Sequence, residues 1–287
     1  MHAHNRMSAP RRLRLITWNV ARRVEALPAQ AAALAEREPD IVALQEVTGR
    51  TLRAWEAAFT TLDIPHVDCT LRVADPARAP AGRRRTGVLL AARWRLDPAP
   101  ALTLPWPETG LARRVAGVEL HTVHVPNAAN GVIKPETLSA VRTGLANRGG
   151  PLVLCGDLNT PRREAPDGTV TSFARDSRGR LRPERGTSWD EAELGVVPGL
   201  RDLGFLDAFR TLHGYGAREP SWTWRRIAGH GGGWRLDHVF CSAELRPSAA
   251  RYHHGWRDAG LSDHSALEVD LEPAHARTPR ARPASGR

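Results

Sequence analysis

Residues 152–160 read LVLCGDLNT, a short apolar run that ends in a glycine and two polar side chains. Apolar runs of this length, bounded by turn signals, are typical of buried β-strands. Asp157 and Asn159 therefore stand directly after the predicted strand Leu152–Cys155, where a strand reaches the edge of its sheet. A carboxylate there is often only a turn or capping residue, so its meaning depends on whether the pattern recurs.

The pattern does recur along the chain. Polar residues suited to metal binding and phosphate chemistry stand at the ends of five further strand-like runs. These are Asn19 in ITWNV, Glu46 in IVALQEV, His124 and Asn127 in VHVPN, Asp237 and His238 in WRLDHVF, and Asp263 and His264 in LSDHSALEV. Chance does not readily produce such a set, so we expect these side chains to meet at one edge of a sheet.

Short strands alternate with helical patterns, which predicts an α/β fold. The expected strands are Leu13–Trp18, Ile41–Leu44, Thr86–Ala91, Val115–Val125, Leu152–Cys155, Leu236–Cys241 and Ala266–Leu271. The expected helices are Leu27–Arg37, Thr51–Phe59, Pro135–Asn147, Trp189–Leu194 and Val197–Leu203. An antiparallel hairpin, Val115–Glu119 turning into His121–Val125, argues against a purely parallel sheet.

The 287 residues suit one large domain, which we expect at 13–272 between a disordered basic N-terminus, 1–12, and a disordered basic tail, 273–287. Two stretches rich in Arg, Pro and Gly, Asp75–Arg85 and Pro161–Thr187, are expected to be long loops. Such loops are either functional or mobile, and the sequence leaves both interpretations open.

Composition excludes several classes of protein. No apolar run reaches the roughly 20 residues that cross a bilayer, so no membrane association is expected. The first residues contain no apolar segment of a secretory signal. The three cysteines form no CxxC pair, and their odd number is a poor disulfide framework, so we expect a reducing cytoplasm, with Cys155 and Cys241 as buried thiols of apolar strands. The protein is expected to be a monomer.

The net charge of +10 and the isoelectric point near 11.0 indicate a surface that attracts polyanions. Such charge adds a salt-sensitive, sequence-independent contribution to nucleic-acid binding. Part of it lies in the two predicted tails, so the charge supports a nucleic-acid partner without deciding it.

Four short motifs, LQEV at 44–47, GDLN at 156–159, RLDH at 235–238 and SDH at 262–264, resemble those of the endonuclease/exonuclease/phosphatase superfamily. The resemblance extends from Arg14 to Leu271. It implies a DNase I-like α/β fold, a four-layer sandwich in which two packed mixed β-sheets are flanked by helices.

A further resemblance is to the exonuclease III-type abasic-site nucleases. Its motifs are VHVPNAANG, TSWDEAELGVVPGLRDLGFLDAFRTLH, SWTWRR and GGGWRLDHVF. The implied function is a Mg²⁺-dependent phosphodiesterase, with Mn²⁺ as a substitute, that hydrolyses double-stranded DNA. It would act as an abasic-site endonuclease, a 3′–5′ exonuclease or both in DNA repair.

The resemblance assigns roles to the strand-end residues. Asp157 would orient and deprotonate the attacking water, and Asn159 would hold that water or a phosphate oxygen. His264 would contact the phosphate as a charged imidazole, with Asp237 fixing its tautomer. His124 joins this catalytic set, in the place of a tyrosine.

The remaining residues are assigned to metal, phosphate and substrate. Mg²⁺ prefers carboxylate and amide oxygens, so Glu46 is the expected ligand, with Asn19 and Asp263 beside it. Asn127 would bind phosphate. The pocket for a flipped-out, base-less sugar would be walled by Trp224, Trp234 and Leu236.

Three departures favour an alternative substrate. Ala21 stands where the subgroup has an Asp, Val47–Thr48 replaces a Thr-Lys pair, and His124 replaces a tyrosine. The alternative is a superfamily enzyme acting on RNA, a phosphoinositide or a small phosphoester. A nucleic-acid-binding protein without catalysis is disfavoured, because the main catalytic set is retained.

Overall fold

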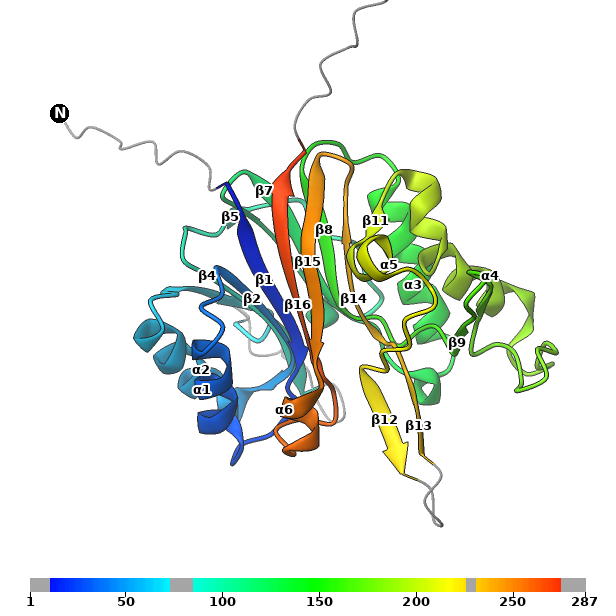
Figure 1. The fold of residues 1–287 in the computed structure, drawn as a ribbon, viewed down its shortest axis with the longest axis horizontal. Coiled ribbons are helices and arrows are strands. Elements are labelled where there is room, and N and C mark those ends of the chain that lie inside the picture. The colour runs from blue at the N-terminus through cyan, green and yellow to red at the C-terminus, as the bar shows by residue number, and fades with distance from the viewer. Residues whose placement is uncertain (1–10, 73–84, 226–230, 275–287) are drawn as a thin grey trace, which may run out of the picture.

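The computed structural model describes residues 11–72, 85–225 and 231–274. Within them, two mixed β-sheets of six strands each pack face to face (Figure 1). In spatial order the first sheet contains β15 (Leu245–His253), β16 (Ala266–Pro273), β1 (Leu13–Asn19), β2 (Ile41–Thr48), β4 (Thr86–Ala92) and β3 (His66–Cys69). The second contains β11 (Leu206–Asp207), β14 (Asp237–Cys241), β8 (Leu152–Asp157), β7 (Val118–His124), β6 (Gly110–Val115) and β5 (Asp97–Pro98).

Helices cover the outer faces of both sheets. In chain order they are α1 (Leu27–Ala35), α2 (Gly49–Thr61), α3 (Ile133–Leu145), α4 (Gly186–Val196), α5 (Ala208–His213) and α6 (His254–Asp258), with 3₁₀ turns η3 (Pro107–Thr109), η4 (Ala128–Asn130) and η5 (Gly199–Leu203). The helices α1, α2 and α6 lie beside the first sheet, and α3 and α4 lie beside the second (Figure 1). The four-layer α/β sandwich expected from the sequence is therefore confirmed.

Three apolar layers hold the sandwich together. The layer between the sheets contains Leu15 and Leu267 from the first sheet and Val153 from the second. The outer layers pack Trp18 with the α2 residues, and Leu154 with the α3 residues. Because each central strand is buried on both faces, its sequence is almost continuously apolar rather than alternating.

The predicted hairpin exists, but its turn lies elsewhere. Strands β6 and β7 pair antiparallel from Gly110↔Val123 to Val115↔Val118, so the turn is Ala116–Gly117 and not residue 120. Both turn residues have positive φ, 49° and 84°. A two-residue turn of this kind matches the right-handed twist of its strands, and Gly117 was the sequence signal that the prediction overlooked.

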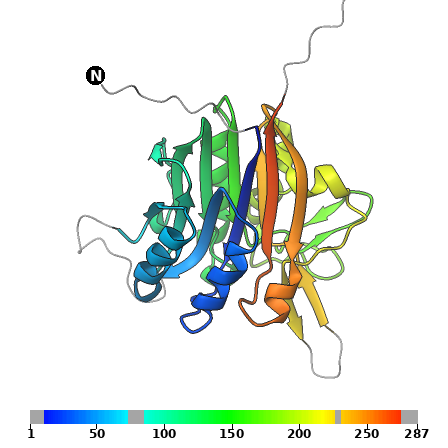
Figure 2. The same cartoon turned by 60° about the vertical axis from the view of Figure 1, so that its left-hand side comes forward.

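The sequence pattern missed the edge strand β15 and the ribbon of β12 (Trp222–Arg225) and β13 (Gly231–Trp234). A register shift at Pro247 and Ala249 interrupts the pairing of β15, and its outward positions are polar. The β12–β13 ribbon pairs Trp222 with Trp234 and extends beyond the ends of the two sheets (Figures 1 and 2).

Residues 161–187, expected to be a long loop, are folded onto the body of the protein. They contain the short pair β9 (Arg163–Glu164) and β10 (Val170–Thr171). The buried carboxylate of Glu164 forms ion pairs of 2.7 Å with both Arg210 and Arg235. Ion pairs with residues distant in the sequence thus hold this segment in place, and a local sequence pattern cannot reveal them.

The remaining expectations concern the two tails, the first basic loop, the cysteines and membrane association. The expected tails and loop lie largely outside the described residues, at 1–10, 275–287 and 73–84. Among the described residues, the first strand begins at Leu13 and the last ends at Pro273. All three cysteines are buried free thiols. None of the described helices has the length and apolarity needed to cross a membrane.

Replacing the buried Glu164 by alanine should destabilise the fold, because Glu164→Ala leaves two buried guanidinium groups with less compensation. We expect a loss of about 3–5 kcal/mol in the free energy of unfolding, measured by urea denaturation. The control Arg246→Ala breaks an exposed pair with Glu272 and should cost less than about 1 kcal/mol. Equal losses in the two variants would contradict this prediction.

Candidate active site

The polar strand-end residues meet where the two sheets come together, not at the edge of one sheet. The first sheet contributes Asn19, Glu46 and His264, and the second contributes His124, Asp157 and Asp237. The pairs β1/β2 and β7/β8 are parallel, so their carboxyl ends lie together, and the antiparallel strands β16 and β14 begin at that end. This arrangement follows from sheet-on-sheet packing, which a strand pattern does not contain.

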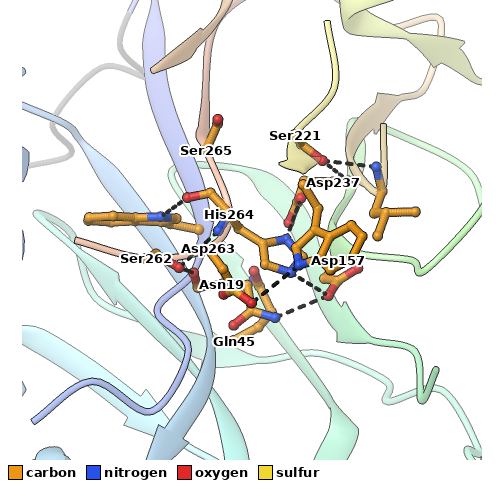
Figure 3. Close-up of polar contacts among 12 residues, drawn as sticks. Asn19, Gln45, Asp157, Ser221, Asp237, Ser262, Asp263, His264 and Ser265 are labelled. Carbon is orange, nitrogen blue, oxygen red and sulfur yellow. Dashed lines mark hydrogen bonds and ion pairs between the residues drawn. The ribbon is translucent and has the colours of Figure 1, made fainter. Parts of the chain in front are cut away.

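The centre of the site is the buried pair of His264 and Asp237 (Figure 3). His264 Nδ1 lies 2.8 Å from Asp237 Oδ2, and His264 Nε2 lies 3.8 Å from Asp157 Oδ2. Burial by itself lowers the pKa of His264, but the negative charges of Asp237 and Asp157 outweigh it and raise the pKa to about 10. The imidazole is therefore a cation at neutral pH.

Asp157 is buried beside this cation. Burial raises its pKa above the ordinary value, and the charge of His264 opposes that shift. Asn159 fixes the carboxylate, because its backbone N–H donates to Asp157 Oδ1 at 2.9 Å and its side-chain amide donates to Oδ2 at 3.3 Å. Asn159 has a φ of 50°, which brings its amide back onto the strand end.

A set of buried hydrogen bonds positions His264. The indole N–H of Trp18 donates to the His264 carbonyl at 3.0 Å, and the His264 N–H donates to Ser262 Oγ at 3.1 Å. Ser262 Oγ in turn donates to the Asn19 carbonyl at 2.6 Å. On the opposite side, Ser221 Oγ accepts the N–H of Asp237 at 3.1 Å. Both members of the pair are thus held through their backbones (Figure 3).

Glu46 and Asn19 lie next to Asp157. Glu46 has a φ of 58° and lies where the pairing of β2 with β4 shifts register, a bulge that redirects its side chain. Asn19 accepts the N–H of Ala21 at 3.0 Å and donates to Asp157 at 3.0 Å and to Glu46 at 3.3 Å. Two carboxylates and an amide therefore converge at the floor of the site.

The carboxylates of Glu46 and Asp157 fit a hard divalent cation, which prefers oxygen ligands, while the Asn19 amide turns its N–H groups and not its oxygen toward them. A second compact group, Asp157, Asp237 and His264, places possible ligand atoms within 4.8 Å of one another. It fits less well, since a protonated imidazole has no lone pair to offer. Asp263 lies on the exposed rim, where it accepts the indole N–H of Trp222 at 3.2 Å.

Four of the remaining predicted residues, His124, Asn127, Trp234 and Leu236, line the same cavity, whose volume is about 730 Å³. His124 Nε2 lies 3.8 Å from both Glu46 and Asp157, and Asn127 is an exposed cap of η4. Trp234 and Leu236 form an apolar wall. Trp224, expected in this wall, does not line the cavity.

Sequence reasoning missed several cavity residues. Trp222 stacks on Trp234 with ring centroids 5.1 Å apart and planes 9° apart. Arg22, with a φ of 57°, pairs its Nε with Glu46 Oε2 at 2.9 Å. Lys134 is buried, paired with Glu193 at 2.8 Å. Arg22 could have been found because it directly follows Ala21, the position where the resemblance implies an Asp near the metal. Trp222 could have been found because it belongs to the SWTWRR motif.

Two other sequence features have structural roles. His238 is buried, and its Nε2 lies 2.8 Å from the Thr160 carbonyl, so it packs rather than faces solvent. Val47 is a core residue, and Thr48 caps α2 through Thr51. The residues after Glu46 therefore serve the fold.

A model of the endonuclease/exonuclease/phosphatase family matches residues 16–264. The chain belongs to this family. It is accordingly a metal-dependent phosphoesterase hydrolase. No curated protein sequence matches it.

Solved structures show the shared family fold. An AP endonuclease from Archaeoglobus fulgidus has a TM-score of 0.65 at 21% identity, covering 90% of this chain and 98% of its own. TDP2 from D. rerio, complexed with single-strand DNA product, gives 0.64 at 16%, covering 92% and 100%. The 3′ phosphatase NExo from Neisseria, bound to a product DNA hairpin, gives 0.59 at 24%, covering 90% and 98%.

The charge of His264 should depend on Asp237. In the presence of a chelator, we expect histidine-ring NMR to find His264 protonated at neutral pH, and Asp237→Asn to lower its pKa. Because the folded-state pKa of about 10 exceeds the ordinary 6.5, the pair stabilises the fold below pH 6.5, and this contribution is lost as pH rises through about 10. The control Asp258→Asn, at an exposed aspartate, should leave the ring unchanged. A neutral His264 in the wild type at pH 7 would contradict the assignment.

Proposed function

We propose that this phosphoesterase is a Mg²⁺-dependent DNA phosphodiesterase that cuts at abasic sites, trims 3′ ends, or both. The observation that carries the proposal is the single cavity that joins the Asp157–His264–Asp237 group to an apolar wall of Trp234 and Leu236. Phosphodiester chemistry needs the first part, and a sugar without a base fits the second.

The chain's own residues can perform each step of the hydrolysis. Asp157, whose pKa is raised by burial, orients the water and accepts its proton. Asn159 holds that carboxylate in place. His264, charged and fixed by Asp237, donates to a phosphate oxygen as negative charge develops.

Glu46 and Asn19 would hold the Mg²⁺, or Mn²⁺ in its place, with Asp263 reaching in from the rim. When bound, the ion supplies Lewis-acid stabilisation of the phosphoryl and leaving oxygens. His124 and Asn127 line the same cavity as phosphate contacts, with His124 Nε2 3.8 Å from both Glu46 and Asp157. Arg22, beside Glu46, provides a further positive group at the mouth.

The assignment of DNA as substrate is supported by the net charge of the chain and by its similarity to solved structures of DNA-processing enzymes. The net charge of +10 favours a polyanionic substrate. The similar structures include an AP endonuclease, an enzyme with single-strand DNA product and a 3′ phosphatase with a DNA hairpin. We propose duplex DNA as the substrate of a monomer in the reducing cytoplasm, in keeping with the free buried thiols.

A second candidate is a family enzyme that acts on RNA, a phosphoinositide or a small phosphoester. It is favoured by the site's departures, Ala21 in place of a carboxylate and Arg22 paired with Glu46. Labelled duplexes with an abasic site, a recessed 3′ end or a 3′-phosphate, each incubated with Mg²⁺ and with EDTA, separate the candidates. Absence of cleavage on all three would overturn the DNA assignment.

Removing the Glu46 carboxylate should weaken metal use while sparing the fold. Loss of a residue that only supports a metal ligand lowers activity about 10- to 100-fold. We expect Glu46→Gln, which removes a proposed ligand itself, to lower kcat/KM by more than this. Calorimetry should also show weaker Mn²⁺ binding. Thermal unfolding should stay near wild type, because the side chain is partly exposed and the change is isosteric. Undiminished cleavage by chelated wild-type enzyme would refute the metal's role.

Removing the indole of Trp234 should reduce discrimination for abasic DNA. Extrusion is least costly where the base is already missing, and Trp234→Ala enlarges the cavity so that it no longer selects the smaller group. We expect the ratio of cleavage efficiencies, abasic over intact duplex, to fall towards one, with a smaller loss on 3′-phosphate ends. The control Trp94→Ala alters a half-buried indole packed against the inter-sheet core. A wild type without abasic preference would remove the pocket hypothesis and leave the phosphoesterase.

A further inference from the structure

The β12–β13 ribbon carries a cluster of three indoles, Trp222, Trp224 and Trp234. Trp222 and Trp234 are register partners, and Trp224 lies two residues further along the same strand face. The ring of Trp224 lies 4.5 Å from Trp234, and Trp222 lies 5.1 Å from Trp234. The cluster is therefore continuous along the ribbon, and Trp234 is its centre.

Two glycines of β13 have no room for a side chain beside β12. A Cβ on Gly232, the register partner of Trp224, would lie 2.3 Å from the indole ring. A Cβ on Gly233 would lie 2.5 Å from the side chain of Pro220. Any side chain at Gly232 would therefore displace Trp224, so the ribbon is built to hold that indole against its partner strand.

Trp224 borders a second groove of about 660 Å³, separate from the active-site cavity. Its other walls come from Arg162 and Arg163, in the basic segment 161–187, and from Arg218. Among the described residues, Trp234 lines both hollows. The indole cluster thus connects the site of phosphate chemistry to the second groove.

The charges of the groove are divided between its back and its rim. At the back, Arg210 and Arg235 are neutralised by Glu164 and Asp207 at 2.7 Å. At the rim, no hydrogen bond or ion pair within the described part of the chain engages the guanidinium groups of the three other arginines, Arg162, Arg163 and Arg218. The rim acid Glu219 is paired with His254. The charge of Arg163 helps to lower the pKa of Asp167, so Arg162 and Arg218 are the rim cations that no acidic partner among the described residues engages.

We propose that the second groove binds a single-stranded DNA segment that continues from the phosphate held in the active-site cavity; the identity of the strand rests on the proposed function. Unengaged guanidinium groups bind backbone phosphates, and indoles stack on bases. Only an unpaired strand has base faces free to stack, so the groove selects single strands over duplex. The basic segment 161–187 then acts as a wall for substrate.

Binding can be measured without cleavage, by fluorescence anisotropy of a labelled oligodeoxythymidylate in EDTA. We expect Trp224→Ala to weaken this binding about tenfold, Trp224→Phe to retain most of it, and a blunt duplex to bind both variants as it binds the wild type. Gly232→Ala, which keeps the indole but displaces it, should weaken binding in the same way.

Salt dependence tests the rim separately. Arg162→Ala and Arg218→Ala should each reduce the slope of log affinity against log salt by about 0.7, the contribution of one phosphate contact on a single strand. The matched control, Arg246→Ala, removes an exposed guanidinium outside both hollows and should leave the slope unchanged. The arginine variants decide the question even where Trp224→Ala proves unstable in thermal unfolding, because Arg218 is exposed and Arg162 is only half-buried.

Unchanged oligonucleotide affinity in Trp224→Ala, or equal loss on duplex and single strand, overturns the proposal, as do unchanged slopes in both arginine variants. The test also separates this proposal from the function above. A chain that binds the oligonucleotide through Trp224 but cleaves no DNA keeps the groove and loses the proposed activity. A chain that cleaves DNA while Trp224→Ala binds normally keeps the activity and loses the groove.

Discussion

The ion pair of Asp237 and His264 is the contact on which the rest of the site depends. It joins the two sheets at one end, because His264 precedes β16 of the first sheet and Asp237 begins β14 of the second. Its geometry sets the charge of the imidazole and places Nε2 beside Asp157. A small slide of one sheet over the other would separate these groups, so the geometry of the candidate site depends on the apolar packing between the sheets.

Further polar contacts cross the same gap. Asn19 bonds to Asp157, and the Gln45 amide donates to Thr17 of its own sheet and to Thr122 of the other. Burying Asp157 and Asp237 is costly unless a cation and hydrogen bonds compensate, and His264 supplies the cation. Arg22 adds a second cation beside Glu46. With Ala21 uncharged, the neighbourhood of Glu46 is more positive than the resemblance to the abasic-site nucleases implied.

The local sequence pattern was sufficient to predict those strands and helices whose signals lie within a few neighbouring residues. The strand that ends in Asp157, the helix after Thr48 and the strand that ends in Asn19 were all recognisable, since apolar runs and caps are local signals. Pattern failed for β15, whose Pro247 and polar outward face obscure an edge strand. It also failed for residues 161–187, which look like a loop because the partners of Glu164, Arg210 and Arg235, are distant in sequence.

The sequence by itself determined the α/β class, the strand-end residues of the site and the family whose motifs they form. The tertiary structure alone decided that these residues come from two sheets, that Trp222 and not Trp224 joins Trp234 in the active-site wall, and that Arg22 lies on Glu46. The physical reason is that residue type and local periodicity specify each strand. The meeting of strand ends, by contrast, depends on how two sheets pack and on ion pairs between residues far apart in the chain.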